Sequence, residues 1–542
     1  MPIELQIEGS RLLTLTMLSP LLGVLLVGLV PATQPGRARG AAILSASITF
    51  LLSFNVLSRF VTHGRGFQFA ERVEWLPALG IDYILGIDGI SLWLIVLTTL
   101  LTLLVVIAST SIHEKLRAYL ASMLFLEVGM LGAFMALDAL TFYVFWELML
   151  VPMYFLIGIW GGSRRIYAAL KFFLYTAFGS LLMLVAIVYL AFAHQDQFGE
   201  VSFFLGDWVN LQLSVREELL LFSAFALAFA IKVPVFPFHT WLPDAHVEAP
   251  TGGSVILAGV LLKMGLYGLI RFGIPVFPFA THAAAPTFAV LGVIGIVFGA
   301  LVAWMQTDIK KLVAYSSVSH LGFCVLGYAA INIQGMQGSI LQMLNHGVST
   351  AALFFLVGVV YDRKHTRLCA DYGGLARKTP VFAFVFLVFT LSSVGLPLTN
   401  GFVGEFLILL GSFQFSPVLA AVAVTGVIFG AMYMLSLYRR IMFGPFDEAK
   451  NGDLTDLTMR ERLVFAPLFA LVFVIGLYPQ FILDDIAPPS RRLLEHLRGK
   501  EPAQAPAALE DGVQSARSVT APADTDTVDY AIRVRTEEGV QG

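Results

Sequence analysis

The chain has 542 residues, of which 57% are hydrophobic and only 13% are charged, with a formal net charge of -3. Soluble proteins carry about 25% charged residues, so the composition excludes an ordinary soluble fold and indicates a membrane protein. The small negative charge predicts no nucleic-acid partner. The two cysteines, Cys324 and Cys369, form no CxxC pair, so no iron–sulfur cluster, zinc or other metal site is expected.

Apolar runs of about 20 residues recur along the whole chain, and each is long enough to cross a bilayer as a helix. The sequence therefore predicts an all-α polytopic membrane protein of about fourteen transmembrane helices. In chain order, the expected spans are 11–31, 41–61, 86–109, 117–137, 139–159, 168–192, 218–238, 253–273, 286–305, 311–331, 338–360, 381–412, 416–438 and 461–483.

Basic residues concentrate in every second loop between these spans. Examples are Arg37, Lys115, Arg164, Lys310 and Arg363. The positive-inside rule places these loops in the cytoplasm. Both termini then lie on the non-cytoplasmic side, which requires an even number of spans and agrees with fourteen.

Two of the expected spans contain residues that interrupt a helix. Pro234 and Pro237 interrupt the seventh span, and Gly395, Pro397 and Asn400 interrupt the twelfth. The breaks lie at matching positions if the chain holds two inverted five-helix repeats, and such breaks mark a transport site near the midplane. The alternative is an ordinary proline kink in each span, repaired by packing.

This pattern divides the chain into five parts. We expect a three-helix segment at 1–116, a first repeat at 117–273, a second repeat at 286–440, the fourteenth span at 441–487 and an extramembrane tail at 488–542. The tail is rich in proline and charge to about residue 526, which indicates an extended linker. The stretch TVDYAIRVRT then alternates apolar and polar residues, which predicts a strand that adds to a neighbouring subunit. The alternative is a disordered tail with an accidental pattern.

Four charged side chains fall inside the expected spans, namely Glu147, Lys232, Lys263 and Glu405. Each costs about 2.5–3.5 kcal/mol at the centre of a membrane helix. Stability alone is a poor reason to retain them, because apolar residues often match a buried ion pair. Proton relay is the chemistry they allow, since burial and a nearby carboxylate shift the pKa of a lysine in opposite directions. The alternative is a static Glu147–Lys232 salt bridge that fixes packing.

Histidines lie between these charges in the sequence. His320 and His346 fall inside the tenth and eleventh spans beside Ser or Asn, so a hydrogen-bonded relay between Lys263 and Glu405 is predicted. The alternative is that each histidine only packs.

Further polar residues are secondary candidates. A cluster after the seventh break contains His239, Asp244, His246 and Glu248. A wet cytoplasmic entrance is expected there, because the spacing matches no standard metal-ligand pattern. Glu127 and Asp138 border the fourth and fifth spans; either could couple to a neighbouring subunit, or Asp138 could simply cap the fifth helix.

Five stretches carry a resemblance to a known family. They are FYVFWELMLVPMYFLIGIWGG, KFFLYTAFGS, KVPVFPFHTWLPDAHVEAPTGGSVILAGVLLKMGLYG, AYSSVSHLGF and GFVGEF. The chain resembles the antiporter-like membrane subunits of respiratory complex I over residues 10–485, and most of all the M-type subunits, called chain 4 in mitochondria. The tail after about residue 490 is not part of this resemblance.

The resemblance implies a proton-translocating subunit of NADH:quinone oxidoreductase with fourteen helices and two inverted repeats. It implies that Glu147, Lys232, Lys263 and Glu405 form the central axis, linked by His320 and His346. It also implies a bacterial inner (plasma) membrane and other complex I membrane subunits as partners, especially those of L and N type. Glu405 favours the M type, since N-type subunits have lysine there. The L type is disfavoured because no long amphipathic lateral helix is expected after the fourteenth span.

No cofactor motif is present in the chain, so flavin, iron–sulfur clusters and quinone are expected in partner subunits. Two alternative functions stay open at this point. One is a subunit of a multisubunit sodium/proton antiporter, which shares these motifs. The other is a scaffold with inert charges.

Overall fold

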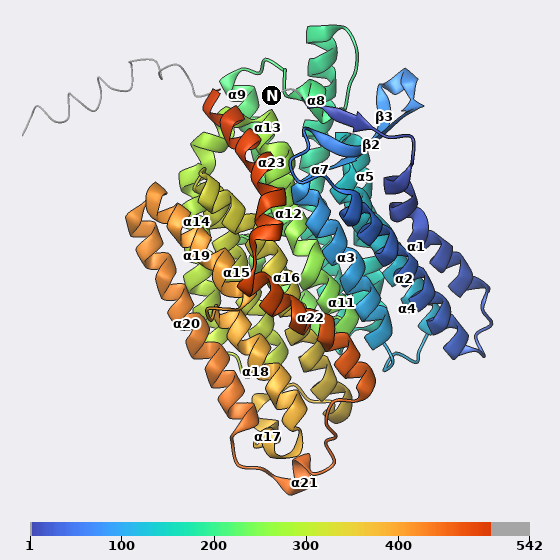
Figure 1. Cartoon of the computed structure of the whole chain (residues 1–542), viewed down its shortest axis with the longest axis vertical. Coiled ribbons are helices and arrows are strands. Elements are labelled where there is room, and N and C mark those ends of the chain that lie inside the picture. The colour runs from blue at the N-terminus through green and yellow to red at the C-terminus, as the bar shows by residue number, and fades with distance from the viewer. Residues whose placement is uncertain (1–2, 500–542) are drawn as a thin grey trace, which may run out of the picture. The chain divides into compact units, whose positions relative to one another are not determined.

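The computed structural model describes residues 3–499, and this part of the chain is mostly helical (Figure 1). Eleven of the described helices are long and apolar enough to cross a membrane, or twelve if one bent pair counts as a span. The predicted class of polytopic helical membrane protein is therefore confirmed.

The N-terminal elements are β1 (Leu5–Ile7), α1 (Leu12–Leu29), α2 (Pro35–Arg59), β2 (Phe67–Leu76), β3 (Ile81–Ile87) and α3 (Gly89–Ala108). Next come α4 (Leu116–Met135), α5 (Ala139–Leu148), α6 (Leu150–Trp160), α7 (Arg165–Phe198), α8 (Leu205–Trp208), α9 (Val215–Lys232), α10 (Trp241–Glu248), α11 (Thr251–Ile256), α12 (Leu262–Gly268) and α13 (Ile274–Val276). The last elements are α14 (Pro278–Trp304), α15 (Ile309–Ala329), α16 (Ile333–Lys364), α17 (Leu375–Lys378), α18 (Pro380–Val394), α19 (Asn400–Phe415), α20 (Pro417–Met442), α21 (Glu448–Asn451), α22 (Met459–Leu477) and α23 (Gln480–Gly499).

Three predicted spans do not pass the same test of length and composition by themselves. They fall on α9, on the pair α18 and α19, and on α22, which passes only together with α23. α9 carries charged residues at both ends, and α18 has only 15 residues. The count of fourteen, like the inverted repeats, thus stays a prediction.

Both predicted helix breaks are present. α9 ends at Lys232, and the chain resumes as a short 3-10 turn at Phe238–Thr240 before α10. Pro234 and Pro237 have no backbone N–H to continue the helix. α18 ends at Val394 because Gly395 takes a left-handed conformation with φ of 78°, and α19 begins at Asn400.

The eighth predicted span, from α11 to α13, is the centre of the fold. Its apolar window is 100% buried, whereas the windows of α1, α2 and α20 are at most 39% buried. Two π-helical turns, Leu257–Leu261 and Leu269–Gly273, interrupt its α-helical geometry. Such wide turns often occur at functional sites, and here the first of them ends two residues before Lys263.

A small sheet, which the sequence analysis did not predict, accompanies the helices. β2 pairs with β1 in parallel and with β3 in antiparallel, in the order β1-β2-β3. From β2, the buried Glu71 accepts hydrogen bonds from the backbone N–H groups of Leu13 (2.9 Å) and Thr14 (3.2 Å) at the start of α1. Arg11, the N-cap residue of α1, provides no such cap, so the sheet supplies a carboxylate to the positive end of that helix.

The start of the predicted linker was wrong. The chain is still helical from residue 488 to Gly499, because α23 continues through Pro488 and Pro489. α22 and α23 meet at a bend of 69°. α23 packs on α3 (Figure 1). The indole of Trp93 on α3 donates to Asp485 on α23 (3.0 Å). The predicted strand TVDYAIRVRT lies outside the described residues.

Candidate functional site

Glu147 stands at a second kind of break, inside the fifth predicted span. α5 ends at Leu148 and α6 begins at Leu150. Pro152, in the first turn of α6, has no N–H to donate to the carbonyl of Leu148, which explains an interruption at this point. The half-buried Glu147 therefore lies in the last turn of α5 rather than in the middle of a regular helix.

Lys232 is the last residue of α9 and is only 1% exposed. Its Nζ has no hydrogen-bond partner among the described residues, and neither does Oε1 of Glu147. Within residues 3–499, no nitrogen–oxygen contact of 4.0 Å or less joins Lys232 to Glu147. The alternative of a static Glu147–Lys232 salt bridge is thus wrong for this conformation. We call Glu147 and Lys232 the open pair.

Lys263, in contrast, forms direct hydrogen bonds. It lies on α12, fully buried, and its Nζ is 2.6 Å from Nδ1 of His346 on α16. Nζ also donates to the backbone carbonyl of Ala258, which belongs to the π-helical turn one turn earlier. The wide turn thus offers the lysine an acceptor within its own span.

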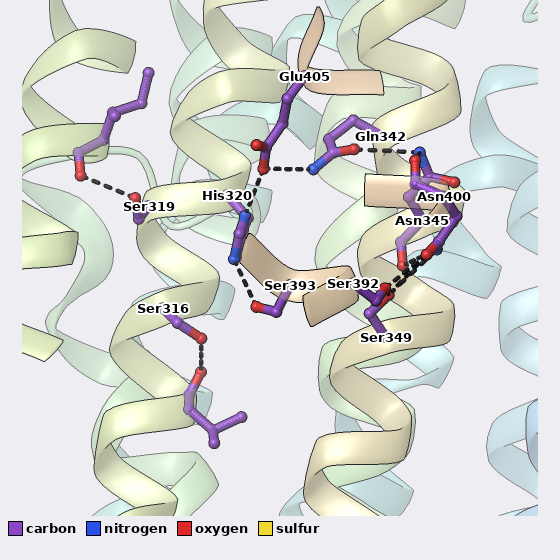
Figure 2. Close-up of polar contacts among 12 residues, drawn as sticks. Ser316, Ser319, His320, Gln342, Asn345, Ser349, Ser392, Ser393, Asn400 and Glu405 are labelled. Carbon is purple, nitrogen blue, oxygen red and sulfur yellow. Dashed lines mark hydrogen bonds and ion pairs between the residues drawn. The ribbon is translucent and has the colours of Figure 1, made fainter. Parts of the chain in front are cut away.

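His320 and Glu405 are likewise in contact. The sequence predicted a link between them only from the order of these residues along the chain. Nδ1 of His320 on α15 is 3.0 Å from Oε1 of Glu405 on α19, and Nε2 is 3.2 Å from Oγ of Ser393 on α18 (Figure 2). Gln342 on α16 donates to the same Glu405 oxygen at 3.0 Å. All of these residues are buried.

The two contacts lie next to each other. The rings of His320 and His346 are 5.8 Å apart between centroids. Both rings line a cavity of about 10 Å³, close to the volume that one water molecule needs. We call Lys263, His346, His320 and Glu405 the bonded chain.

Amide and hydroxyl groups that the sequence analysis did not single out support the bonded chain at the broken twelfth span (Figure 2). Asn345 donates to the carbonyl of Asn400 at 2.7 Å, and Asn400 donates back to the carbonyl of Asn345 at 3.2 Å. The hydroxyl of Ser392 donates to the Asn400 side chain at 2.6 Å and contacts Ser349 at 2.6 Å. A helix break leaves backbone groups without helical partners, so polar side chains are needed nearby. The Asn and Ser residues close to the predicted break could therefore have been predicted to support it.

The cluster after the seventh break does not converge on one point. Asp244 forms an ion pair with Lys171 (2.7 Å), and Glu248 accepts from the backbone N–H of Arg164 (2.9 Å). His239 packs on Phe236 and Phe298, and His246 stacks on Phe354. His239, His246 and Glu248 are buried, so the wet entrance expected there is not seen at these side chains. Within residues 3–499, no group of three His, Cys, Asp or Glu could hold a metal ion.

Lys310, predicted in a cytoplasmic loop, is instead buried. Its Nζ donates to the carbonyl of Ala249 (2.5 Å) at the C-terminal end of α10, where Arg367 donates to the carbonyl of Val247. Arg367 also pairs with Asp308 at 3.3 Å. Cations at a helix C-terminus satisfy its free carbonyls. They fix α10 against α15, which a count of loop charges could not reveal.

The remaining two secondary candidates differ from each other. Asp138 is the N-cap of α5 and accepts from the N–H of Thr141 (2.7 Å), which confirms the capping alternative. Glu127 on α4 is 0% exposed, and neither of its carboxylate oxygens has a hydrogen-bond partner among the described residues. The structure therefore does not join Glu127 to the open pair or to the bonded chain.

A buried ion pair that the sequence analysis missed lies away from this axis. Arg271, at the end of the eighth span, is 2.6 Å from Asp88, the N-cap of α3. Burial raises the pKa of Asp88, but attraction and hydrogen bonding from Arg271 outweigh it, so the pKa lies below its usual value. The arginine in YGLIRF was a readable signal, since few charges occur inside these spans.

The fold and the buried charges define a class: a polytopic ion-translocating subunit with broken helices. The family model for the NADH:quinone oxidoreductase/Mrp antiporter transmembrane region matches residues 136–430. The chain belongs to this family, and its high-coverage relatives are M-type subunits of NADH-quinone oxidoreductase, called chain 4 in mitochondria.

Three comparisons give the degree of similarity. The chain is 46% identical to NADH-quinone oxidoreductase subunit M of Rhodobacter capsulatus over 470 residues, covering 85% of this chain and 91% of the relative. It is 44% identical to NADH-ubiquinone oxidoreductase chain 4 of Marchantia polymorpha over 481 residues, covering 88% and 96%. The structure resembles a chain of respiratory complex I from Thermus thermophilus with a TM-score of 0.81 and 33% identity, covering 90% and 99%.

A chain of the Mrp complex from Dietzia also matches, with a TM-score of 0.76, 21% identity, and coverage of 89% and 99%. At this identity the match shows a shared fold alone. The antiporter branch is therefore the more distant one, and the predicted resemblance to the complex I membrane subunits is confirmed.

Proposed function

We propose that this chain carries protons across the membrane within an NADH:quinone oxidoreductase, through the open pair and the bonded chain. The observation that carries the proposal is the bonded chain, in which two directly contacting pairs face each other across a small cavity. Four buried ionisable side chains from four helices lie in sequence, with contacts of 2.6 Å between Lys263 and His346 and 3.0 Å between His320 and Glu405.

The geometry supports a simple sequence of proton transfers. Nζ of Lys263 gives a proton to Nδ1 of His346, and the ring releases its other proton from Nε2 into the cavity between the histidines. His320 receives that proton on Nε2 and gives the proton on its Nδ1 to Glu405. Each imidazole is neutral before and after the transfer, because it takes up one proton and releases another.

The open pair supplies the step at which the transfer can be driven. A lysine in a dry site holds its proton when a carboxylate is near and loses it when the carboxylate withdraws. The breaks after Lys232 and after Leu148 let both residues move without disrupting a long helix. A shift of α5 or α9, imposed by other subunits, would then set the charge of Lys232.

The partners follow from this role. The chain would assemble with other membrane subunits of the complex, including neighbours of L and N type, in a bacterial inner membrane with both termini on the non-cytoplasmic side. Flavin, iron–sulfur clusters and quinone would be bound by other subunits. The sodium/proton antiporter alternative has weaker support, because the relative of that type is 21% identical whereas the subunit M relative is 46% identical.

The substitution Glu147→Ala in the whole complex tests the proposal. We expect NADH-driven proton uptake into vesicles to fall at least about tenfold per assembled complex, because the carboxylate that controls Lys232 is gone. The matched control is Glu200→Ala, which removes an exposed carboxylate outside the spans. Unchanged uptake in an assembled Glu147→Ala complex would contradict the role of the open pair.

A further inference from the structure

The ammonium group of Lys232 is not bare, although it has no hydrogen-bond partner. Its Nζ lies 4.8 Å from the centroid of the Trp146 ring and 6.0 Å from that of Phe172. All three side chains are buried to within 1%. An aromatic face attracts a cation through its quadrupole, most strongly for Trp and most strongly where water is excluded.

The indole is held in place from several sides. Phe229 contacts it edge-on at 5.5 Å between centroids, and Phe142 lies at 5.6 Å. Trp146 also directly precedes Glu147 in the last turn of α5, and successive helix residues point about 100° apart. A rotation of this short, broken helix would therefore exchange the indole face for the carboxylate in front of Lys232.

We propose that Trp146 is a positioning residue for proton transfer, whose indole face holds the Lys232 ammonium while Glu147 is withdrawn. Trp146 and Glu147 are then alternative partners of one lysine on one helix end. The indole keeps the lysine in the site between transfers. A lysine held by an indole releases its proton more readily than a lysine held by a carboxylate. This inference rests on the proposed proton path and adds a second partner to it.

The consequence for pH dependence follows from the groups around the lysine. Among the described residues, Glu147 is the charged side chain that acts on the Lys232 ammonium, and the aromatic rings come from α5 and α7. A weaker ring attraction destabilises the charged lysine. As the pH rises, proton pumping should then begin to decline at a lower pH than in the wild type.

The test uses the whole complex with fluorinated tryptophans incorporated at position 146 alone. Fluorination weakens the quadrupole while keeping the shape of the ring. We expect pumping per assembled complex to fall stepwise with each added fluorine, to a total of roughly tenfold, and the alkaline limb of the pH profile to move down by up to about one unit. Trp146→Phe should retain more activity than Trp146→Leu, because phenylalanine keeps an aromatic face.

The control is the same series at Trp208, whose buried indole donates to the carbonyl of Ser202 and contacts no cation among the described residues. If fluorination at 146 leaves pumping and the pH profile unchanged while Lys232→Ala abolishes pumping, the inference on Trp146 is overturned and the proton path stands. If Lys232→Ala itself pumps normally, the proposed path fails. Variants that lower only the amount of assembled complex would show that Trp146 merely packs, which also overturns the inference.

Discussion

The open pair and the bonded chain hold the same kinds of side chain in opposite ways. In the bonded chain, each ionisable group has a partner within 3.0 Å. In the open pair, Nζ of Lys232 and Oε1 of Glu147 have no hydrogen-bond partner among the described residues, and the lysine rests on an aromatic ring. On the proposed path, protons would cross the bonded chain by short transfers, whereas the open pair would have to move.

The surrounding backbone agrees with this division. Both members of the open pair are next to a helix end, so small movements of α5 and α9 are inexpensive. The central members of the bonded chain lie well inside α15 and α16. Rigid elements suit proton transfer, which depends on distances held within fractions of an ångström.

The largest effect is expected from Lys232→Arg. A guanidinium stays protonated to about pH 12 and above, so it fills the site with charge but cannot release a proton. NADH-driven proton uptake should fall as far as in Lys232→Ala, by at least about tenfold per assembled complex. Normal uptake with arginine would mean that the open pair needs only a fixed charge, and the contrast with the bonded chain would disappear.

An intermediate effect is expected from His346→Leu. Among the described residues, Lys263 then keeps the carbonyl of Ala258 as its hydrogen-bond partner, and on the proposed path protons would cross a wider gap. We expect pumping per assembled complex to fall, but by less than in Lys232→Arg, because Glu405, His320 and Lys263 stay in place. His194→Leu is the matched control, because His194 is also buried but lies at the far end of α7. Equal losses in both variants would show a general packing effect.

The smallest effect on pumping, but a large one on stability, is expected at Asp88 and Arg271. Their ion pair is buried and static, so Arg271→Leu should destabilise the subunit by about 3–5 kcal/mol while pumping per surviving complex stays unchanged. Arg271 lowers the folded-state pKa of Asp88, so the pair stabilises above the ordinary value of 3.8 and loses this contribution as the pH falls below it.

Thermal unfolding of the complex, measured between about pH 3 and pH 7, checks this prediction. The wild type should lose stability at the acid end by more than the variant does, because the variant has no pair to lose. A loss of pumping per assembled complex in Arg271→Leu would instead place this pair on the proton path.

Much of the site could be predicted because charges are rare in membrane helices. The sequence alone identified four charged residues inside the spans, namely Glu147, Lys232, Lys263 and Glu405. Prolines and glycines predicted both helix breaks. The sequence predicted that His346 and His320 lie between Lys263 and Glu405, but not which histidine contacts which charge. Lys263 and His346 are 83 residues apart, and their contact depends on how the central span packs on α16. Nor could the sequence predict the choice of an indole rather than a carboxylate beside Lys232.

The errors have physical reasons too. The sheet was missed because β1 has three residues and β2 stays mostly exposed at its end, so neither shows a clear alternation. α23 was read from residue 488 as a linker because two prolines stand in its middle. They are tolerated there since the helix packs on α3 and α16.

The π-helical turn Leu257–Leu261 gives the central span one residue more than a regular α-helix of the same length would hold. A π turn holds one residue more than the α-helix would, and each residue of an α-helix turns the next by about 100°. Deleting one residue from this turn would restore a regular helix without changing any charge. Because the π turn takes up that residue without rotating the helix that follows it, Lys263 would still face His346, but the carbonyl of Ala258 would return to an ordinary helical hydrogen bond. The wide turn therefore gives the lysine its second acceptor, and not its direction.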